Sequence, residues 1–297
     1  MSSRRNFSLE RTKQTIPFYL LAFPAVALSL AIIFIPAMTT IGSSFTSWNG
    51  ISTVKEFVGL RNYIELLQNE TFMKSLGNNL KWMCMYLVIP VALAMLASIC
   101  LLKTKRRTAY QVLFLLPYVI APIANALIWL SIIYSPVTGL VGYFKTHMGA
   151  TQLFSPLTNV KTALAGVAAV DIWHYWGYLC VVYVAALRQT PLDHIEAGTL
   201  DGCNGWQLFR YIYFPSMLPT FKLMMMLIVI QSFMQFDYVY LLTSGGPANS
   251  TEMMGTQCYS YAFNLFQFGK SGAIAVMMSL IGLIASITYT RLSRNEG

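Results

Sequence analysis

Long apolar stretches alternate with short polar segments along almost the whole chain. A membrane-spanning helix needs about 20 predominantly apolar residues, because the hydrocarbon core is about 30 Å thick and a helix rises about 1.5 Å per residue. Six stretches meet this requirement: residues 17–38, 80–102, 109–134, 162–187, 219–242 and 271–289. The pattern predicts an all-α membrane protein with six transmembrane helices.

The first stretch follows basic residues, as the apolar part of a signal peptide does. It is longer than a typical signal peptide core, and no small-x-small cleavage site clearly follows it. We therefore interpret it as a retained span. A short amphipathic stretch, residues 60–67, lies in the segment between the first and second spans.

Composition supports a membrane protein, because 56% of the residues are hydrophobic and 10% are charged, whereas about a quarter are charged in an ordinary soluble domain. This excludes a soluble enzyme, a disordered chain and a nucleic-acid binder. With the N-terminus inside, 13 of the 20 Lys and Arg lie in the inner segments, including the short loop 103–107. Because inner loops are enriched in Lys and Arg, we expect both termini in the cytoplasm.

Residue types needed for catalysis or metal binding do not occur in a suitable pattern. The five cysteines form no CxxC pair, and the three histidines are scattered without metal-ligand spacing. Gly269-Lys270-Ser271 resembles the end of a phosphate-binding loop, but Asn264 stands where the first glycine should be. We expect no catalytic residue and no metal site in this chain.

The segment between the fourth and fifth stretches, residues 188–218, carries the most informative motif. Its residues with fixed spacing are Glu196, Ala197, Gly198, Asp201, Gly202, Ile212 and Pro215. Here the chain resembles the permease subunits of binding-protein-dependent ABC importers, whose signature is E-A-A, three residues, G, nine residues and I-x-L-P. Gly198 and Phe214 depart from this signature, which usually has Ala and Leu there.

In that family, the segment docks in a groove of a cytoplasmic ATPase and carries its motion to the spans. We expect Glu196 near the N-terminus of a short helix, where the helix dipole favours an anion. Gly202 allows a positive φ, and Pro215 is expected to end the local helix before the fifth span. Taken alone, the segment could also be a solvated amphipathic connector.

Three further motifs resemble those of carbohydrate importers. Residues 57–63 read F-V-G-L-R-N-Y, residues 116–118 read L-P-Y, and residues 242–247 read L-T-S-G-G-P. The last is typical of the permease type that includes the larger permease of the maltose transporter. The chain is similar to the shorter form of this type, found among oligosaccharide and glycerol-phosphate importers.

The resemblance implies a type I ABC importer permease fold in the cytoplasmic membrane of a bacterium. Residues 1–16 would be a cytoplasmic segment, 17–292 the six-span domain with its coupling loop 188–218, and 293–297 a cytoplasmic tail. The implied partners are a homologous second permease, two cytoplasmic ATPase subunits and an extracellular solute-binding protein. ATP and magnesium would bind the ATPase, so we expect no cofactor in this chain.

Polar side chains inside the spans are candidates for cargo contact, because such groups are costly in lipid and face the bundle interior or a wet cavity. Asp171, His174 and Tyr175 share one face of the fourth span, since they are spaced i, i+3 and i+4. Carboxylates and amides bind sugar hydroxyls, and aromatic rings stack on the apolar faces of sugar rings. The fifth span adds Ser232 and Gln235 to this set.

Alignment with the larger maltose permease at the three motifs implies the same positions. The residues at its sugar-contacting positions are Tyr118, Asp171, His174, Tyr175, Ser232 and Gln235. Most of these differ in type from the maltose permease, so maltose itself is not the expected cargo. Hydrogen bonding between helices, within this chain or to the second permease, is the alternative role for each residue.

The expected function is therefore that of a permease subunit in an ATP-driven importer of a carbohydrate, by alternating access. An oligosaccharide is the favoured cargo, and Asp171 argues against acidic cargo unless its carboxyl group is protonated. A non-sugar solute is the main alternative. A proton-coupled secondary transporter using Asp171, Asp237 or His174 would not need the motif in the segment 188–218. A membrane-embedded enzyme would need a paired acid and base or a set of metal ligands, and none is spaced convincingly.

Overall fold

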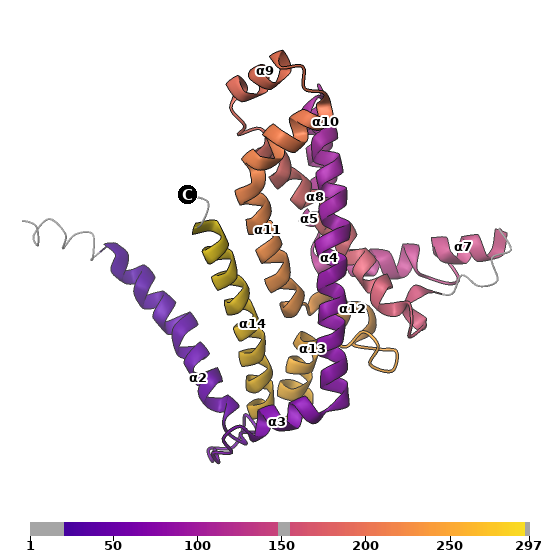
Figure 1. Ribbon diagram of the computed structural model, residues 1–297. Helices are drawn as coiled ribbons and strands as arrows, with labels where there is room; N and C mark the ends of the chain where they lie inside the picture. The colour runs from indigo at the N-terminus through magenta and orange to yellow at the C-terminus, as the bar shows by residue number, and fades with distance from the viewer. Residues whose placement is uncertain (1–20, 148–154, 295–297) are drawn as a thin grey trace, which may run out of the picture.

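The computed structural model describes residues 21–147 and 155–294 of the 297-residue chain. The predicted segment 1–16, the start of the first predicted span and the last residues of the predicted tail lie outside the described residues. The described residues form helices joined by loops, with one isolated β-bridge between Thr46 and Phe57. The predicted all-α class is confirmed (Figure 1).

Five helices are long and apolar enough to cross a membrane, and a sixth span consists of two helices joined at a sharp bend. Three of the five are α4 (Glu70–Leu102), α8 (Ala163–Leu187) and Phe268–Arg291, which lies within α14 (Phe268–Arg294). The helix Leu21–Ser44 contains η1 (Leu30–Phe34) and α2 (Ile35–Ser44). The helix Gly205–Met234 contains α10 (Gly205–Leu208), η4 (Phe209–Tyr213) and α11 (Phe214–Met234). Short helices join them: α3 (Arg61–Gln68), α7 (Leu140–His147), η3 (Pro156–Thr158), α9 (Leu192–Leu200), α12 (Asp237–Thr243), α13 (Met254–Tyr259) and η5 (Ser260–Asn264). The helix α3 confirms the predicted amphipathic stretch.

The third predicted span is not one helix over 109–134. The helix α5 (Arg107–Val119) meets the helix formed by α6 (Pro122–Ile128) and η2 (Trp129–Ile133) at an angle of 94°. Pro122 has no N–H to donate to the carbonyl group of Tyr118, and it disfavours helical backbone at the residue before it. Ile120 and Ala121 are accordingly extended, with ψ values of 129° and 139°. The proline therefore ends α5.

The fifth predicted span ends at Met234 instead of residue 242. Gln235 has a ψ of 127° and Phe236 a φ of −142°, so neither continues the helix. A new short helix, α12, begins at Asp237, whose carboxylate lies in its first turn, where the helix dipole favours an anion. The chain thus has two broken helices.

The prediction that Pro215 ends a local helix is also wrong. A continuous helix runs from Gly205 to Met234 and includes the proline. The π-helical turn η4 precedes Pro215, and in it the N–H of Phe214 donates to the carbonyl of Phe209. This wider turn shifts the hydrogen-bond register just before the proline, whose missing N–H then lies in the first turn of α11.

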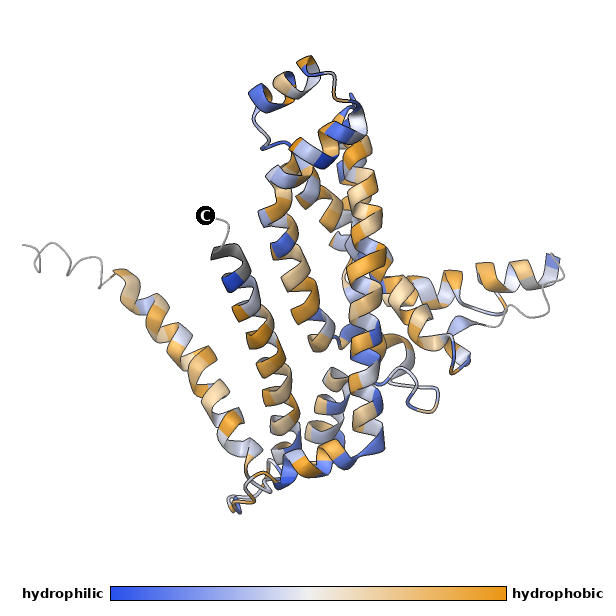
Figure 2. Ribbon diagram, in the orientation of Figure 1, coloured by the Kyte–Doolittle hydropathy of each residue, from blue (hydrophilic) through white to orange (hydrophobic). Residues whose placement is uncertain are grey.

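The helix α8 lies at the centre of the bundle and packs against α4, α5, α11 and α12. Small residues permit this close packing. At Gly177, a β-carbon would overlap the carbonyl oxygen of Phe114 on α5. Leu179, Tyr183 and Leu187 are fully buried beside it. The helix Leu21–Ser44, by contrast, buries none of its most apolar stretch and is orange along its length in Figure 2.

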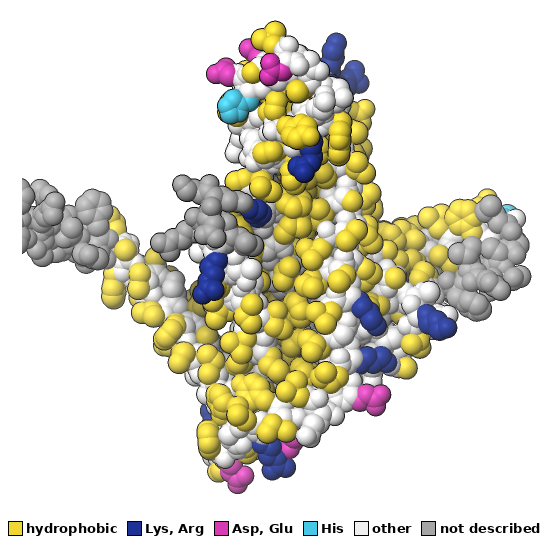
Figure 3. Space-filling view, in the orientation of Figure 1, with side chains coloured by type: hydrophobic (Ala, Val, Ile, Leu, Met, Phe, Trp, Pro, Cys, Tyr) yellow, Lys and Arg dark blue, Asp and Glu magenta, His cyan; other side chains and the backbone are white. Residues whose placement is uncertain are grey.

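The two ends of the bundle differ in what they hold. Figure 1 shows α9 at one end, which we call the α9 end, and α3 at the opposite end, the α3 end. The first span begins, and α14 ends, toward the α9 end. Apolar side chains cover the middle of the face shown in Figure 3, where Asp and Glu side chains lie toward the two ends and Lys and Arg side chains lie at the ends and along the sides. The 188–218 segment and the described ends of the chain therefore point the same way.

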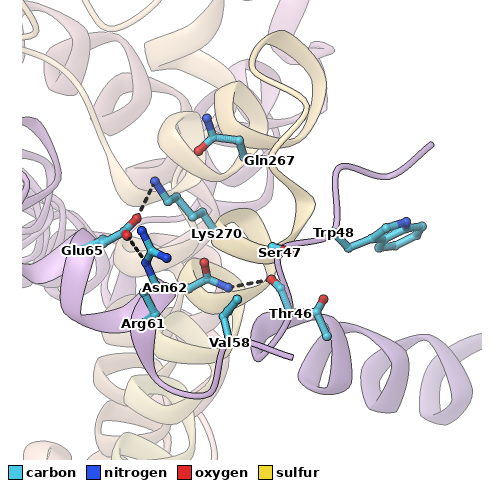
Figure 4. Close-up of a pocket in the computed structure, with 10 residues that line it drawn as sticks. Thr46, Ser47, Trp48, Val58, Arg61, Asn62, Glu65, Gln267 and Lys270 are labelled. Carbon is cyan, nitrogen blue, oxygen red and sulfur yellow. Dashed lines mark hydrogen bonds and ion pairs between the residues drawn. The ribbon is translucent and has the colours of Figure 1, made fainter. Parts of the chain in front are cut away.

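At the α3 end, the F-V-G-L-R-N-Y motif joins three helices (Figure 4). The amide of Asn62 donates to the carbonyl groups of Ser44 and Thr46, both at 2.8 Å. Glu65 forms ion pairs with Lys270 at 2.9 Å and with Arg61 at 2.7 Å. Lys270 first, and Arg61 second, lower the pKa of the Glu65 carboxyl. The motif thus fastens the end of α2 to α3 and α14, around a cavity of about 290 Å³.

A second set of hydrogen bonds at this end starts from two neighbouring asparagines on α4. The side chain of Asn79 donates to the carbonyl of Ser232 at 2.7 Å and accepts from the N–H of Met254 at 2.9 Å. Asn78 donates to the carbonyls of Ser250 and Glu252, both at 3.0 Å. These amides satisfy backbone groups near the end of α11, in the loop after α12 and at the start of α13, all in the buried interior. They also tie the L-T-S-G-G-P loop to α4.

Candidate functional site

A cavity of about 310 Å³ lies where the two broken helices meet. Tyr118 and Pro122 flank the first break, and Gln235 and Asp237 flank the second. The helices α4 and α8 supply the remaining walls. Interrupted helices are tolerated at membrane depth where the freed backbone lines a cavity or is buried in protein, so this position is a candidate for a solute site.

All six residues predicted for cargo contact line this one cavity. They are Tyr118, Asp171, His174, Tyr175, Ser232 and Gln235. Three separate spans supply them. The residues predicted from a shared helix face and those predicted from the motif alignment therefore line the same cavity. Their contact with cargo stays a prediction, but their proximity to one another is a feature of the structure.

The polar centre of the cavity is a pair of side chains from α8 and the second break. The amide nitrogen of Gln235 donates to Oδ2 of Asp171 at 3.1 Å, and both residues are only partly buried. The hydroxyl of Tyr86, whose side chain also lines the cavity, is buried and has no hydrogen-bond partner among the described residues. A carboxylate and an amide side by side present several acceptors and a donor, which suits a ligand with adjacent hydroxyl groups.

Aromatic rings form the rest of the wall. Tyr118 is 39% exposed, stacks on Tyr178 with ring centroids 4.6 Å apart, and lies 5.2 Å from the ring of His174. Tyr86 and Tyr175 face each other at 5.9 Å. The Nε2 atom of His174 is buried and has no hydrogen-bond partner among the described residues. The first helix break therefore places the exposed ring of Tyr118 beside a histidine that can still form a hydrogen bond.

Ser232 is the predicted residue whose structural role is clearest. Its side chain is 2% exposed and its hydroxyl donates to the carbonyl of Ile228 at 2.7 Å. Its own carbonyl accepts from Asn79. The hydroxyl oxygen can still accept a hydrogen bond from the cavity, but its proton is already used within α11.

Sequence reasoning missed the contribution of α4. Trp82 and Tyr86 line the cavity, and their rings stack at 5.4 Å. Their i, i+4 spacing inside the second apolar stretch was the available signal, since two large aromatic residues on one helix face can form a wall. Asn78 and Asn79 gave a weaker signal, because their partners are distant in the sequence.

The predicted coupling segment forms a compact element at the α9 end. Gly202 has a φ of +81°, as its motif position suggests. The N–H of Cys203 donates to the carbonyl of Gly198 at 3.0 Å, and the N–H of Gly202 donates to the carbonyl of Thr199 at 3.1 Å. This is a Schellman motif, which ends a helix with a left-handed residue. Gly198 packs against the side chain of Ile212, so the two halves of the signature are in contact.

Two residues of this segment are placed differently from our expectation. Glu196 lies in the middle of α9, because the helix already begins at Leu192, directly after Pro191. Asp193 is the acidic residue of its first turn. Glu196, Ala197 and Asp201 are exposed, and Pro215 lies inside a helix. Exposed side chains on a short helix that projects from the bundle suit contact with another protein.

Residues 90–296 match the family of binding-protein-dependent transport system inner membrane components. The chain belongs to this family. The match covers more than half of the sequence, including the predicted coupling segment and all six cavity residues. The resemblance seen in the sequence motifs is confirmed.

Relatives of this inner membrane component match over nearly their full length. A protein named as a probable starch degradation products transport system permease, AmyD of Thermoanaerobacterium thermosulfurigenes, is 31% identical over 96% of each chain. The sn-glycerol-3-phosphate transport system permease UgpA of Agrobacterium fabrum is 28% identical over 89% of each chain. A solved chain from a bacterial ABC transporter for alginate import has a TM-score of 0.84 at 20% identity, covering 97% of this chain and 98% of that chain. The type I permease fold is thereby confirmed.

Proposed function

We propose that the chain is a permease subunit of an ATP-driven importer for a carbohydrate, and that cargo passes through the cavity at the two helix breaks. The observation that carries this proposal is the convergence of Asp171, Gln235 and Tyr118 on one cavity inside an apolar bundle. Its combination of hydrogen-bonding side chains and exposed aromatic rings fits a polyhydroxylated ligand with apolar ring faces. The names of the starch-product and glycerol-phosphate relatives support this class of cargo.

The α9 end would face the cytoplasm of a bacterial cell. The short loop 103–107 lies at this end with its four basic residues, and loops rich in Lys and Arg stay inside. Both termini would then be cytoplasmic, because the first span begins and α14 ends toward the same side. The α3 end would face outward, where an extracellular binding protein delivers the cargo.

The remaining subunits of the proposed importer follow from this arrangement. Two ATPase subunits, which hold ATP and magnesium, would receive α9 and the matching helix of a homologous second permease. The nearly unburied helix Leu21–Ser44 suits contact with that second permease. Closure of the ATPase dimer would move the coupling helices and switch the cavity between outward and inward access.

The test is ATP hydrolysis by the whole complex in lipid nanodiscs, with a panel of sugar-loaded binding proteins. We expect one sugar class to stimulate hydrolysis, and a Glu196→Lys variant to lose ATPase copurification. Glu56→Lys is the matched control, because Glu56 is exposed in the loop at the α3 end and should leave copurification unchanged. The proposal would be refuted if the rate of ATP hydrolysis were the same with and without cargo and the Glu196→Lys variant still copurified with the ATPase. That result would favour a proton-coupled carrier.

The cavity itself is tested by Asp171→Asn in the same nanodiscs. Asparagine replaces one of the two acceptor oxygens with an NH2 donor and removes the negative charge beside Gln235. We expect transport to fall about tenfold, which corresponds to about 1.4 kcal/mol. Assembly with the ATPase should persist. The control is Tyr183→Phe, which changes a fully buried side chain outside the cavity. Equal loss in both variants would mean that the effect arises from packing and not from the cavity.

A further inference from the structure

A larger cavity, of about 950 Å³, lies at the α9 end, between α9 and the ends of α4, α5 and α8. Three basic side chains line it: Lys103, Arg107 and Arg188. No Asp or Glu does so, and the acidic residues of α9 are exposed on its other surfaces. The cavity is therefore a concentrated patch of positive charge beneath the predicted coupling helix.

These three cations have no counter-ion within the part of the chain that the structure describes. Glu65, which pairs with Arg61 and Lys270, lies at the opposite end of the bundle. Arg107 is half-buried, and partial removal of an unpaired cation from water is costly unless an anion approaches it. An anionic group in this cavity would reduce that cost for Arg107, and it would also attract the exposed side chains of Lys103 and Arg188.

A separate observation also points to a ligand. Thr190, which lines the cavity between Arg188 and α9, is 5% exposed, and its hydroxyl has no hydrogen-bond partner. Buried hydroxyl groups are nearly always hydrogen-bonded, and leaving one unpaired is unfavourable. Thr190 thus offers a donor in the wall of a cavity that already attracts anions.

The remaining walls are apolar. Ile99, Leu187 and Phe209 line the cavity beside the cations. The helix α4 ends at Leu102, so the cavity begins where the apolar bundle meets the aqueous phase. A ligand with both a phosphate and an apolar chain matches these walls better than a small soluble anion, and basic pockets between spans on the cytoplasmic side are suited to lipid headgroups.

We propose that this cavity binds the headgroup of an acidic phospholipid from the inner leaflet, and that the bound lipid fastens α9 to the bundle. This rests on the orientation in the proposed function, which places the α9 end in the cytoplasm. The helix α9 otherwise packs mainly against α10 and η4, the helical segment that follows it. A phosphate held by Arg107 of α5, Arg188 and Thr190, with the apolar part of the lipid against Leu192 and Ile195 of α9, would connect α9 to α5 and to the end of α8.

The test counts the lipids retained by the purified complex of this chain, its partner permease and its ATPase. The complex is incubated with equal amounts of phosphatidylglycerol and phosphatidylcholine in detergent, and retained lipid is measured by native mass spectrometry. The variant is Arg107→Gln with Arg188→Gln. Its matched control is Arg106→Gln with Arg210→Gln, which removes the same charge at the same end from residues outside the cavity lining.

We expect phosphatidylglycerol to be retained in preference to phosphatidylcholine. The cavity variant should weaken retention about thirtyfold, since it removes two basic side chains and each contributes about 1 kcal/mol near a lipid headgroup. The control variant should retain lipid as the unaltered complex does. Equal loss in both variants would show only general surface attraction and overturn the proposal. So would equal retention of phosphatidylcholine.

A further arm separates the two sources of phosphate. Inorganic phosphate and glycerol phosphate are added as competitors, and displacement of phosphatidylglycerol by either would replace the lipid with a soluble phosphate ligand. Copurification of the ATPase is measured in the same samples and reports on the proposed function independently. Its loss in the unaltered complex, with lipid retention unchanged, would refute the importer and leave the cavity assignment standing.

Discussion

The two ends of the bundle are held together in different ways. At the α3 end, side chains connect elements that are far apart in the sequence: Asn62 reaches the end of α2, Asn79 reaches both α11 and α13, and Glu65 reaches Lys270. At the α9 end, the hydrogen bonds of the described segment 188–213 are local, as in the capping box of Asn204 and Gln207. One end is fastened between helices, and the other is folded within its own segment.

This difference matches the two tasks that an importer subunit has to perform. A fastened α3 end can keep the helices around the cavity in register, because displacing one helix there breaks buried hydrogen bonds. A locally folded α9 can move as a unit with little loss of contact to the bundle. The comparison therefore predicts that stability depends on the α3 end and that motion is concentrated at the α9 end.

The largest expected effect comes from Asn79→Ala. This change leaves the N–H of Met254 and the carbonyl of Ser232 without partners in a buried site, at a cost of about 1–3 kcal/mol for each group. Thermal unfolding of the purified complex should show a clear drop in the midpoint. Asn204→Ala removes a helix cap at the α9 end and should cost only about 1 kcal/mol. Equal destabilisation by the two variants would contradict the comparison.

A smaller effect is expected from Gly202→Ala. Its φ of +81° is unfavourable for alanine by about 1 kcal/mol, and no atom would obstruct the added methyl group. Because α9 is fastened locally, we expect faster amide hydrogen exchange in residues 192–204 with little change in the thermal midpoint. Gly205→Ala is the control, since its φ is negative and its surroundings are equally open. Faster exchange around Asn79 in Gly202→Ala would show that the ends are not independent.

The smallest effect concerns the pH dependence of the α3 end. Lys270 and Arg61 lower the pKa of Glu65 below its ordinary value of 4.5, so the pair stabilises the fold above that pH and the contribution is lost as the pH falls through the lowered pKa. Glu65→Gln should therefore reduce the loss of stability between neutral and acidic pH. Thermal unfolding at a series of pH values measures this, and an unchanged pH profile would show that the ion pair is fully screened.

The apolar stretches were sufficient to predict the spans, because lipid leaves few structures other than a helix. The fourth span, predicted over 162–187, is Ala163–Leu187 in the structure. The two helix breaks were not predicted. A proline such as Pro122 or Pro215 either breaks or continues a helix, depending on the hydrogen bonds around it, and those depend on neighbouring segments.

The residues of the candidate site were predicted better than the side chains that hold the surrounding helices together. Asp171, His174 and Gln235 were identifiable because polar groups in apolar stretches are rare. Asn78 and Asn79 lie at the edge of an apolar stretch, where polar residues are ordinary. Their importance comes from backbone groups more than 150 positions away in the sequence, which Asn79 reaches at Ser232 and Asn78 at Ser250. No local pattern contains that information.

Hydrogen exchange on the assembled complex, with and without ATP, tests the contrast between the two ends most directly. We predict that amides in residues 192–213 change their exchange on ATP binding, while those in residues 72–82 and 250–258 keep theirs. A change confined to the α3 end, with α9 unaltered, would contradict the account, because the fastened end would then be the part that moves.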